Sequence, residues 1–262
     1  MDPEESDSVL RTVQRAADNG ESVLECLSME SWGVLDGLRR QLHAWKFRAG
    51  APEARLIANT RKACDEVEQR VPEFFGVAEA TMVADGAWAF CVMGRLLERA
   101  VITANGLVSV LEFKEADGGH EEELRLSALL RLLSSRDVYR RVYQMRAETA
   151  PVLDLLWGNP RVPRSVAYCL ARGLAGLREA QDLASPATGR ALDRIDAVLE
   201  AVRGTRWDKL LKQGGGRAAS RSRALLTRLL ELHNTLSDGF LNHQIHIRSH
   251  AQPSLFGPKN AF

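Results

Sequence analysis

The 262-residue chain lacks the motifs that most directly indicate an enzyme class. It contains no GxGxxG, GxxxxGKS/T, GxSxG or HExxH pattern, so neither a nucleotide-binding loop nor a familiar hydrolase motif is present. It also lacks an excess of charge of one sign: 35 basic residues against 34 acidic ones give a formal net charge of +1. That balance gives no electrostatic reason to expect nucleic acid or an acidic membrane as a partner.

Cysteines and targeting signals are equally sparse. The four cysteines lie far apart and form no CxxC or Cys/His pattern, so we expect buried free thiols. The N-terminus, MDPEESDS, is acidic and lacks the basic-then-apolar order of a signal peptide. The one long apolar run contains three charged residues near its centre, which makes it a poor membrane span. These features predict a cytoplasmic protein.

Strand signals are nearly absent, because no long alternation of apolar and polar residues occurs and turn signals are separated by helix-length intervals. We therefore predict an all-α fold. A single multi-helix bundle domain of about seven to nine helices is expected over residues 1–250, followed by an irregular tail over 251–262. The helical segments expected from apolar spacing and breakers span roughly residues 8–27, 28–47, 53–83, 88–110, 121–133, 136–145, 163–183, 186–202 and 220–249.

The most informative segment is residues 88–110, WAFCVMGRLLERAVITANGLVSV, in which Arg95, Glu98 and Arg99 are the only charged residues. A helix that is apolar on every side is buried, and buried charges must be paired. Arg95 and Glu98 are three residues apart and share a helical face. We expect a buried polar cluster that either locks the fold or binds a ligand. In the second case Glu98 acts as a general base or amine-binding group, and the arginines bind carboxylate or phosphate.

A second candidate is the segment RDVYRRVY. Tyr139 and Tyr143 are four residues apart, as are Arg136 and Arg140, so one helix presents two adjacent stripes. Tyrosine and arginine together suit anion recognition and protein interfaces. The alternative is an ordinary exposed helix with no binding role.

A third candidate is a helix start in the segment WGNPRVPRSV, where Pro163 fits the first helical turn. Free backbone N–H groups at such a position favour an anion, and Arg164 and Ser165 would add donors. A plain proline-and-cap start explains the same residues, so both interpretations stay open.

The C-terminal histidines provide a weaker candidate. His243, His246 and His250 recur at i, i+3 and i+7, a spacing that can place imidazoles around a metal. A frayed polar terminus explains them equally well, and no ExxH pair of the di-iron kind occurs. We therefore predict no metal site, with these histidines as the alternative.

Several blocks recur in a recognisable order. They are W-x-F-x-x-x-G-R-x-x-E-R-A at residues 88–100, V-Y-R-R-x-Y at 138–143 and N-P-x-x-P-R-S-V-x-x-C-L at 159–170, preceded by A-x-N-x-x-x-V-x-x-x-L-S-x-E-x-W at 17–32. This succession resembles the alpha-E family of bacterial all-helical proteins. Two departures stand out. Family members usually begin with a helix carrying a first W-x-G-R-x-x-E-R-A-E block, which is absent here, and Val101 replaces the acidic residue that commonly follows E-R-A. If the two E-R-A helices of the family face each other across a polar site, this chain contains one half of that site, and a partner would supply the other half.

The resemblance implies association with a circularly permuted ATP-grasp ligase, often together with a transglutaminase-like protease, in the formation of amide bonds in peptides or small metabolites. The chain would be a helical accessory subunit with no cofactor of its own, and ATP and Mg would bind only through the ligase. Two other hypotheses remain open. One is a stand-alone enzyme with Glu98 as base and Arg164 or Tyr139 as substrate clamps; the other is a self-associating scaffold, that is, a homo-oligomer.

Overall fold

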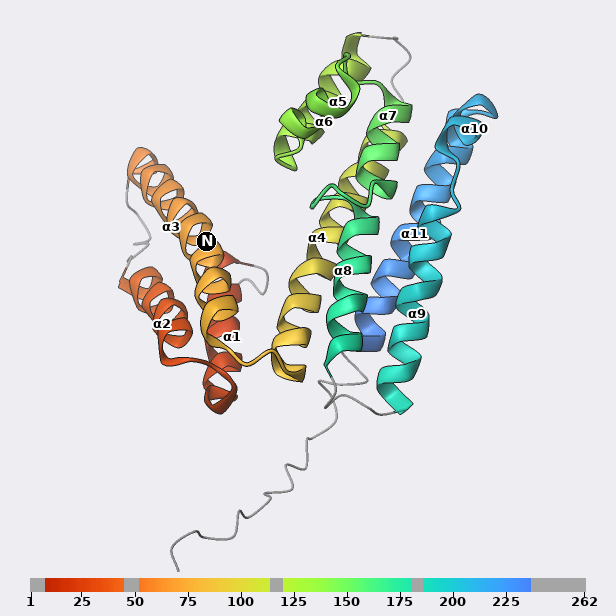
Figure 1. The fold of residues 1–262 in the computed structure, drawn as a ribbon. Coiled ribbons are helices and arrows are strands. Elements are labelled where there is room, and N and C mark those ends of the chain that lie inside the picture. Colours follow the sequence, from red (N-terminus) through yellow and green to blue (C-terminus); the bar gives the residue numbers. More distant parts are fainter. Residues whose placement is uncertain (1–7, 45–51, 114–119, 181–185, 237–262) are drawn as a thin grey trace, which may run out of the picture. The chain divides into compact units, whose positions relative to one another are not determined.

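The computed structural model describes residues 8–44, 52–113, 120–180 and 186–236 (Figure 1). All regular structure in these ranges is helical, which confirms the all-α fold. The eleven α-helices there exceed the predicted seven to nine. The two extra helices, α7 and α10, have only five and six residues, too few to display a helical period in the sequence. The helices are α1 Val9–Glu21, α2 Met29–Ala44, α3 Glu53–Thr81, α4 Gly86–Glu112, α5 His120–Leu132, α6 Arg136–Tyr143, α7 Thr149–Leu153, α8 Val166–Glu179, α9 Pro186–Arg203, α10 Trp207–Lys212 and α11 Gly215–Leu236.

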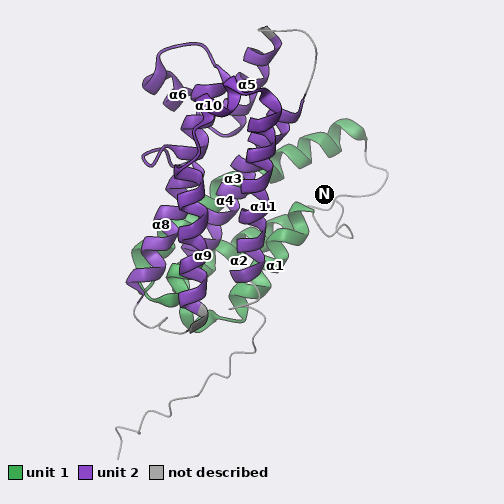
Figure 2. Ribbon diagram, turned by 90° about the vertical axis from the view of Figure 1, so that its right-hand side faces the viewer, with its two compact units in different colours: residues 1–90 green, residues 91–262 purple. Residues whose placement is uncertain are grey.

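The chain divides into two compact units, residues 1–90 and residues 91–262, coloured separately in Figure 2. In the first unit, α2 packs against both α1 and α3. The apolar residues that these three helices bury together are Val13, Leu38, Leu42 and Ala63. This small core is typical of a three-helix arrangement in which each helix contributes one apolar face.

In the second unit, α8 is the most buried helix, with seven buried residues among its 14. It packs against α9, which in turn packs against α11 (Figure 1). Between α7 and α8 the chain forms a π-helical turn, Asp154–Gly158, and then an irregular segment, residues 159–165. We call this segment, together with Gly158, the 158–165 loop. Short π-helical turns are rare and occur frequently at functional sites.

Two further corrections concern glycine and proline. Pro163 lies before α8 and not in its first turn, because the helix begins at Val166 with Ser165 as N-cap. Gly215 and Gly216 belong to α11, although Gly214–Gly216 reads as a flexible connection in the sequence. Of these three glycines, Gly214 has a positive φ, +118°, a conformation that side-chain-bearing residues rarely adopt.

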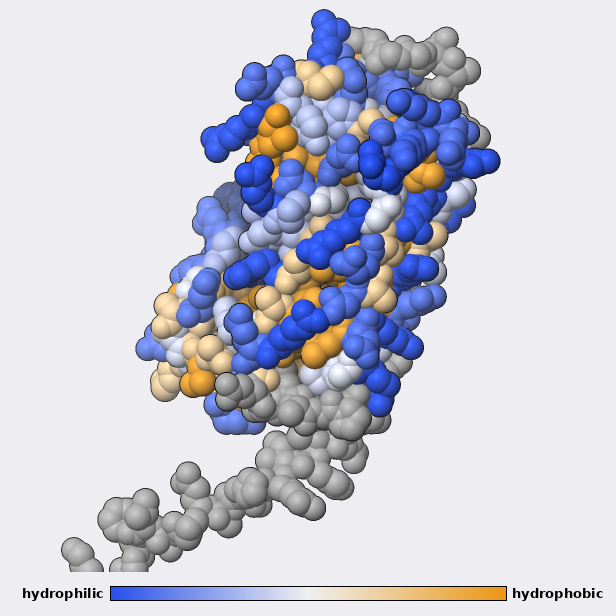
Figure 3. Space-filling view, turned by 45° about the vertical axis from the view of Figure 1, so that its right-hand side comes forward, coloured by the Kyte–Doolittle hydropathy of each residue, from blue (hydrophilic) through white to orange (hydrophobic). Residues whose placement is uncertain are grey.

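No helix in the described ranges combines the length and the apolar character needed to cross a membrane. The face of the molecule in Figure 3 is mostly hydrophilic, with hydrophobic patches between the charged side chains. Apolar atoms normally contribute about half of a folded protein's accessible surface, so such scattered patches need no special explanation.

A close approach between α4 and α8 depends on Gly173. A Cβ atom at this position would overlap the Sδ atom of Met93, which is itself only 1% exposed. Because Met93 is buried, it has little room to move aside. Gly173 therefore allows the helix that carries Arg95 and Arg99 to lie directly against α8.

We expect Gly173→Ala to lower the free energy of unfolding by about 1–2 kcal/mol, because the added methyl group overpacks the contact with Met93. Gly176→Ala, on the same helix, is the matched control, since nothing lies within 4 Å of the added Cβ. There the better helix propensity of alanine predicts no loss, or a gain of up to about 1 kcal/mol. Urea denaturation followed by circular dichroism measures both changes. Equal stability of the two variants would show that the contact is not tight.

Candidate functional site

The charged residues of α4 divide between an exposed and a half-buried face. Glu98 is exposed and forms no hydrogen bond or ion pair with any described residue, so the expectation that it is buried is wrong. It lies on an exposed stripe with Gly94, Ile102 and Asn105, at helical spacing. The stripe contains a glycine and an isoleucine, which count as apolar in the sequence. The sequence of α4 therefore appears apolar on every side, although Ile102 is 46% exposed and this face is accessible to solvent.

The other face of α4 contacts the backbone of the 158–165 loop. Arg95 and Arg99 are half-buried, and Arg99 donates from Nη1 to the carbonyl oxygen of Pro163 at 3.3 Å. One turn further, the buried hydroxyl of Thr103 donates to the carbonyl oxygen of Arg164 at 3.0 Å. Carbonyl groups that are removed from water need such partners, so the partly buried hydrogen bond from Thr103 and the more exposed one from Arg99 tie the loop to α4.

Ser165 fixes both ends of the same loop. As the N-cap of α8, its Oγ accepts a hydrogen bond from the backbone N–H of Tyr168 at 3.0 Å. The same hydroxyl donates to the carbonyl oxygen of Asn159 at 2.5 Å. Ser165 is fully buried, and both hydrogen bonds go to the protein's own backbone. Its hydroxyl is thus engaged in loop structure at the position where an anion donor was predicted.

Two arginines and a thiol gather beside this helix start. Burial lowers the pKa of Arg164, and the positive charge of Arg99 lowers it further. Burial raises the pKa of Cys169 to about 11, although both arginines favour its thiolate. The Cys169 thiol lies 3.5 Å from the carbonyl oxygen of Pro163. It is therefore protonated at neutral pH and is no nucleophile.

The tyrosines of α6 have different environments. Tyr139 is 2% exposed; its hydroxyl donates to the carbonyl oxygen of Arg146 at 2.7 Å and accepts from the N–H of Glu148 at 3.2 Å. These bonds secure the connection between α6 and α7. Arg140 is exposed, whereas Tyr143 is half-buried, with its ring centroid 5.1 Å from that of Tyr139. Tyr143, one of the four residues in the predicted stripes, lines a cavity.

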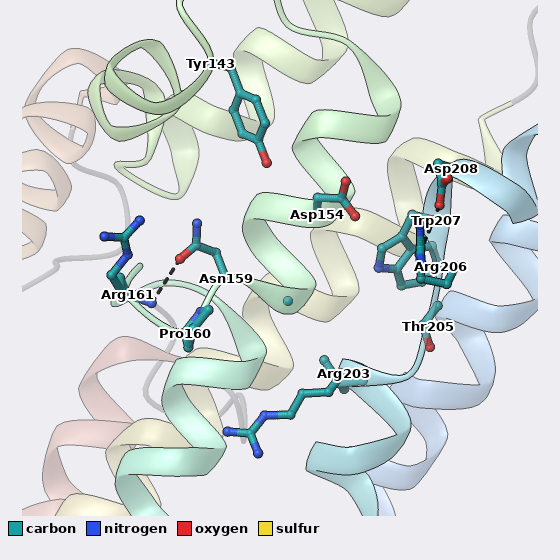
Figure 4. Close-up of a pocket in the computed structure, with 12 residues that line it drawn as sticks. Tyr143, Asp154, Asn159, Pro160, Arg161, Arg203, Thr205, Arg206, Trp207 and Asp208 are labelled. Atoms are coloured by element: carbon teal, nitrogen blue, oxygen red, sulfur yellow. Dashed lines mark hydrogen bonds and ion pairs between the residues drawn. The ribbon is translucent and has the colours of Figure 1, made fainter.

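This cavity is an open groove of about 840 Å³ in the second unit, which we call the polar groove. It lies where the π-helical turn and the 158–165 loop meet the connection between α9 and α10 (Figure 4). In Figure 4 the hydroxyl of Tyr143, the amide of Asn159 and the carboxylate of Asp154 surround its centre. Its charged and polar lining residues are Tyr143, Asp154, Asn159, Arg161, Arg203, Thr205, Arg206 and Asp208; the almost fully buried Trp207 also borders it.

Asp154 is an acid of the groove whose pKa is raised. Partial burial raises its pKa, the negative charge of Asp208 adds to the rise, and Arg206 opposes it. Asp154 itself forms no hydrogen bond or ion pair with any described residue. Arg206, in contrast, pairs with Asp208, with Nε 3.5 Å from Oδ1. A perturbed, unpaired carboxyl group in a cavity is a reasonable indicator of a binding site.

Sequence reasoning missed every charged residue of the groove. Asp154 carried a usable signal, because it is the only charged residue in APVLDLLWG, residues 150–158, just as Arg95, Glu98 and Arg99 are in their apolar segment. The segment from Arg203 to Asp208 carried none: it joins the end of α9 to the start of α10 through residues 204–206 and shows no periodicity. Packing brings it next to residues more than 40 positions earlier.

The predicted histidine alternative, His243, His246 and His250, lies outside the described residues. Within the described part of the chain, no group of three or more His, Cys, Asp or Glu side chains is arranged to hold a metal ion. The polar groove therefore offers charged and hydrogen-bonding side chains without a recognisable metal-ligand set.

Residues 1–241 match a known family, Alpha-E, described as a predicted alpha-helical domain with a conserved ER motif. The chain belongs to the Alpha-E family. Glu98-Arg99 is the only Glu-Arg dipeptide in the chain and therefore corresponds to the conserved ER motif. In α4, Glu98 lies on the exposed face and Arg99 on the half-buried face. The resemblance noted from the ordered sequence blocks is thereby confirmed.

The chain is also similar to uncharacterized proteins of Mycobacterium tuberculosis and Mycobacterium bovis, each 26% identical over 183 residues. The matched region covers 68% of this chain and 20% of each relative, so the chain spans about a fifth of the length of these relatives. No solved structure matches this Alpha-E protein.

The raised pKa of Asp154 predicts a pH-dependent effect on stability. A carboxyl group whose pKa is higher in the folded state destabilises that state once it ionises, so the penalty is present at neutral pH and vanishes below its ordinary pKa of 3.8. We expect Asp154→Asn to stabilise the protein at pH 7 by less than about 1 kcal/mol, because solvent screens this exposed group.

The measurement is the midpoint of urea unfolding for Asp154→Asn and for the parent protein between pH 7 and pH 3.5. Asp193→Asn is the matched control, since Asp193 is exposed and makes no hydrogen bond or ion pair with a described residue. The difference between Asp154→Asn and the parent should shrink as the pH falls. A variant that is less stable than the parent at pH 7 would contradict the assignment.

Proposed function

We propose that this Alpha-E protein is the helical partner of an ATP-grasp amide ligase in a system that forms amide bonds in peptides or small metabolites. The observation that supports this most directly is the match of residues 1–241 to the Alpha-E family, with its Glu-Arg motif intact. The family resemblance associates such helical proteins with ATP-grasp ligases and with transglutaminase-like proteases. ATP and Mg then bind to the ligase, because the chain has no nucleotide-binding motif of its own.

The size of the relatives supports a role in a larger assembly. In the mycobacterial proteins the matched region is a fifth of a much longer chain, so there the helical region is covalently joined to other protein. A helical region that is joined to additional chain in its relatives commonly acts through contact with that additional chain. We therefore expect a protein partner in preference to self-association.

The exposed stripe of α4 is the docking surface in this proposal. It presents Glu98, which has no partner among the described residues, next to Ile102, an exposed apolar side chain. An unpaired acid beside an apolar residue suits an interface in which an arginine or lysine of the ligase pairs with the carboxylate. The adjacent Arg99 does not belong to this stripe: it donates a hydrogen bond to the 158–165 loop.

Stand-alone catalysis by Glu98 receives less support from these features. A general base must reach a bound substrate, and Glu98 does not line the polar groove. Tyr139 and Ser165, two of the predicted substrate-binding residues, already hydrogen-bond to backbone groups. In an accessory role, Glu98 contacts a partner protein from the exposed face of α4 and does not need a substrate cavity beside it.

The test is co-expression with a circularly permuted ATP-grasp ligase from the same organism, followed by calorimetric titration of the two purified proteins. We expect a complex, and we expect Glu98→Arg to weaken it by about tenfold, because the substitution replaces an attraction by a repulsion. Glu231→Arg on α11 is the control, since Glu231 is also exposed and its side chain is unpaired among the described residues. Light scattering on the isolated chain reports self-association.

Failure of the folded protein to bind the ligase at micromolar concentrations would contradict the partnership. A complex that Glu98→Arg and Glu231→Arg affect equally would instead contradict the assignment of the α4 stripe as its docking surface.

A further inference from the structure

The polar groove contains unsatisfied hydrogen-bonding groups of opposite character on its two sides. On one side lies the carboxylate of Asp154, which accepts no hydrogen bond from any described residue. The hydroxyl of Tyr143 is directed toward the same region (Figure 4) and also lacks a described hydrogen-bond partner. A carboxylate that is partly desolvated without a donor gains most from a ligand that brings N–H groups and positive charge.

On the other side lie two donors from the 158–165 loop. The Oδ1 atom of Asn159 accepts a hydrogen bond from the backbone N–H of Arg161 at 3.0 Å, which orients the amide and leaves its Nδ2 donors available. The guanidinium of Arg161 forms no ion pair or hydrogen bond with a described residue. In Figure 4 both side chains lie across the groove from Asp154. This side suits a carboxylate.

The remaining charges of the groove are already neutralised. Arg203 pairs with Glu200, with Nη1 3.2 Å from Oε1, and Arg206 pairs with Asp208. A purely anionic ligand would leave Asp154 unsatisfied and would be repelled by it. A purely cationic ligand would leave Arg161 without a counter-charge. The groups that remain free match a ligand with charges of both signs.

A pair of buried tryptophans lies behind the groove. Trp207 lines it and stacks on Trp157, with ring centroids 5.7 Å apart, and both rings are buried. The indole N–H groups of both residues make no hydrogen bond with the described chain. This buried pair supports the groove from behind, whereas the side chains that a ligand would meet are mostly polar or charged.

We propose that the polar groove binds a short zwitterionic peptide, with its terminal ammonium group at Asp154 and Tyr143 and its carboxylate at Arg161 and Asn159. The volume of about 840 Å³ exceeds that of one amino acid and lies within the range of sites for larger ligands. This inference rests on the proposed function, because it names the substrate class that the helical partner would present to an amide ligase.

Three peptides test the charge requirement on the isolated full chain: tri-alanine, N-acetyl-tri-alanine and tri-alanine amide. Calorimetry or ligand-observed NMR gives each Kd. Tri-alanine should bind, and removal of either terminal charge should weaken binding by about tenfold, the effect of one lost charge-assisted hydrogen bond.

Two substitutions assign the ends of the ligand. Asp154→Asn should weaken tri-alanine binding by about tenfold while leaving the N-acetylated peptide unchanged, because that peptide has no ammonium group to lose. Arg161→Gln should have the corresponding effect on tri-alanine but not on its amide. Asp193→Asn and Arg190→Gln, at exposed positions of α9 without described partners, are the matched controls and should change no Kd.

Absence of tri-alanine binding at millimolar concentrations would overturn the inference, as would equal binding of the three peptides. Measuring ligase association on the same variants separates the two proposals. A ligase complex without peptide binding overturns only the peptide assignment. Peptide binding without a ligase complex overturns only the partnership.

Discussion

The functional end of the second unit depends on hydrogen bonds that terminate on the backbone of one irregular loop. Arg99 and Thr103 donate from α4 to the carbonyl oxygens of Pro163 and Arg164, and Ser165 donates to that of Asn159. The loop has no helical ladder, so a few hydrogen bonds of its own, from Val162 and Ser165, and the donors of α4 hold it in place. Asn159 lies on this loop and lines the polar groove, so the contacts from α4 help to position one wall of the groove.

This dependence gives the two residues of the family motif different tasks. Arg99 works inward, through the loop, whereas Glu98 faces outward without a partner among the described residues. A single helix thereby connects a loop-ordering contact with a surface suited to a second protein. The arrangement accounts for the adjacency of the two residues: neighbours in a helix point about 100° apart, so one can serve the interior and the other the surface.

The all-α fold was predictable because most helices are long enough to show an apolar face, and the ordered sequence blocks identified the family. The predicted burial of Glu98 was wrong, because its exposed neighbours Gly94 and Ile102 are residue types that are normally counted as core residues in a sequence pattern. Asp154 was detectable by the same test that singled out α4. The segment that ends in Asp208 was not, because only tertiary packing places it beside the π-helical turn.

The most direct test of the loop's dependence on α4 is hydrogen exchange in the Thr103→Val variant, which keeps the side-chain shape and removes the donor. The amides of Arg161, Val162 and Ser165, all hydrogen-bonded within the loop, are the reporters. Their exchange should accelerate by about tenfold, the effect of losing one buried hydrogen bond, while residues 8–44 of the first unit stay unchanged. Unchanged exchange at these three amides would show that α4 does not hold the loop and would contradict the account.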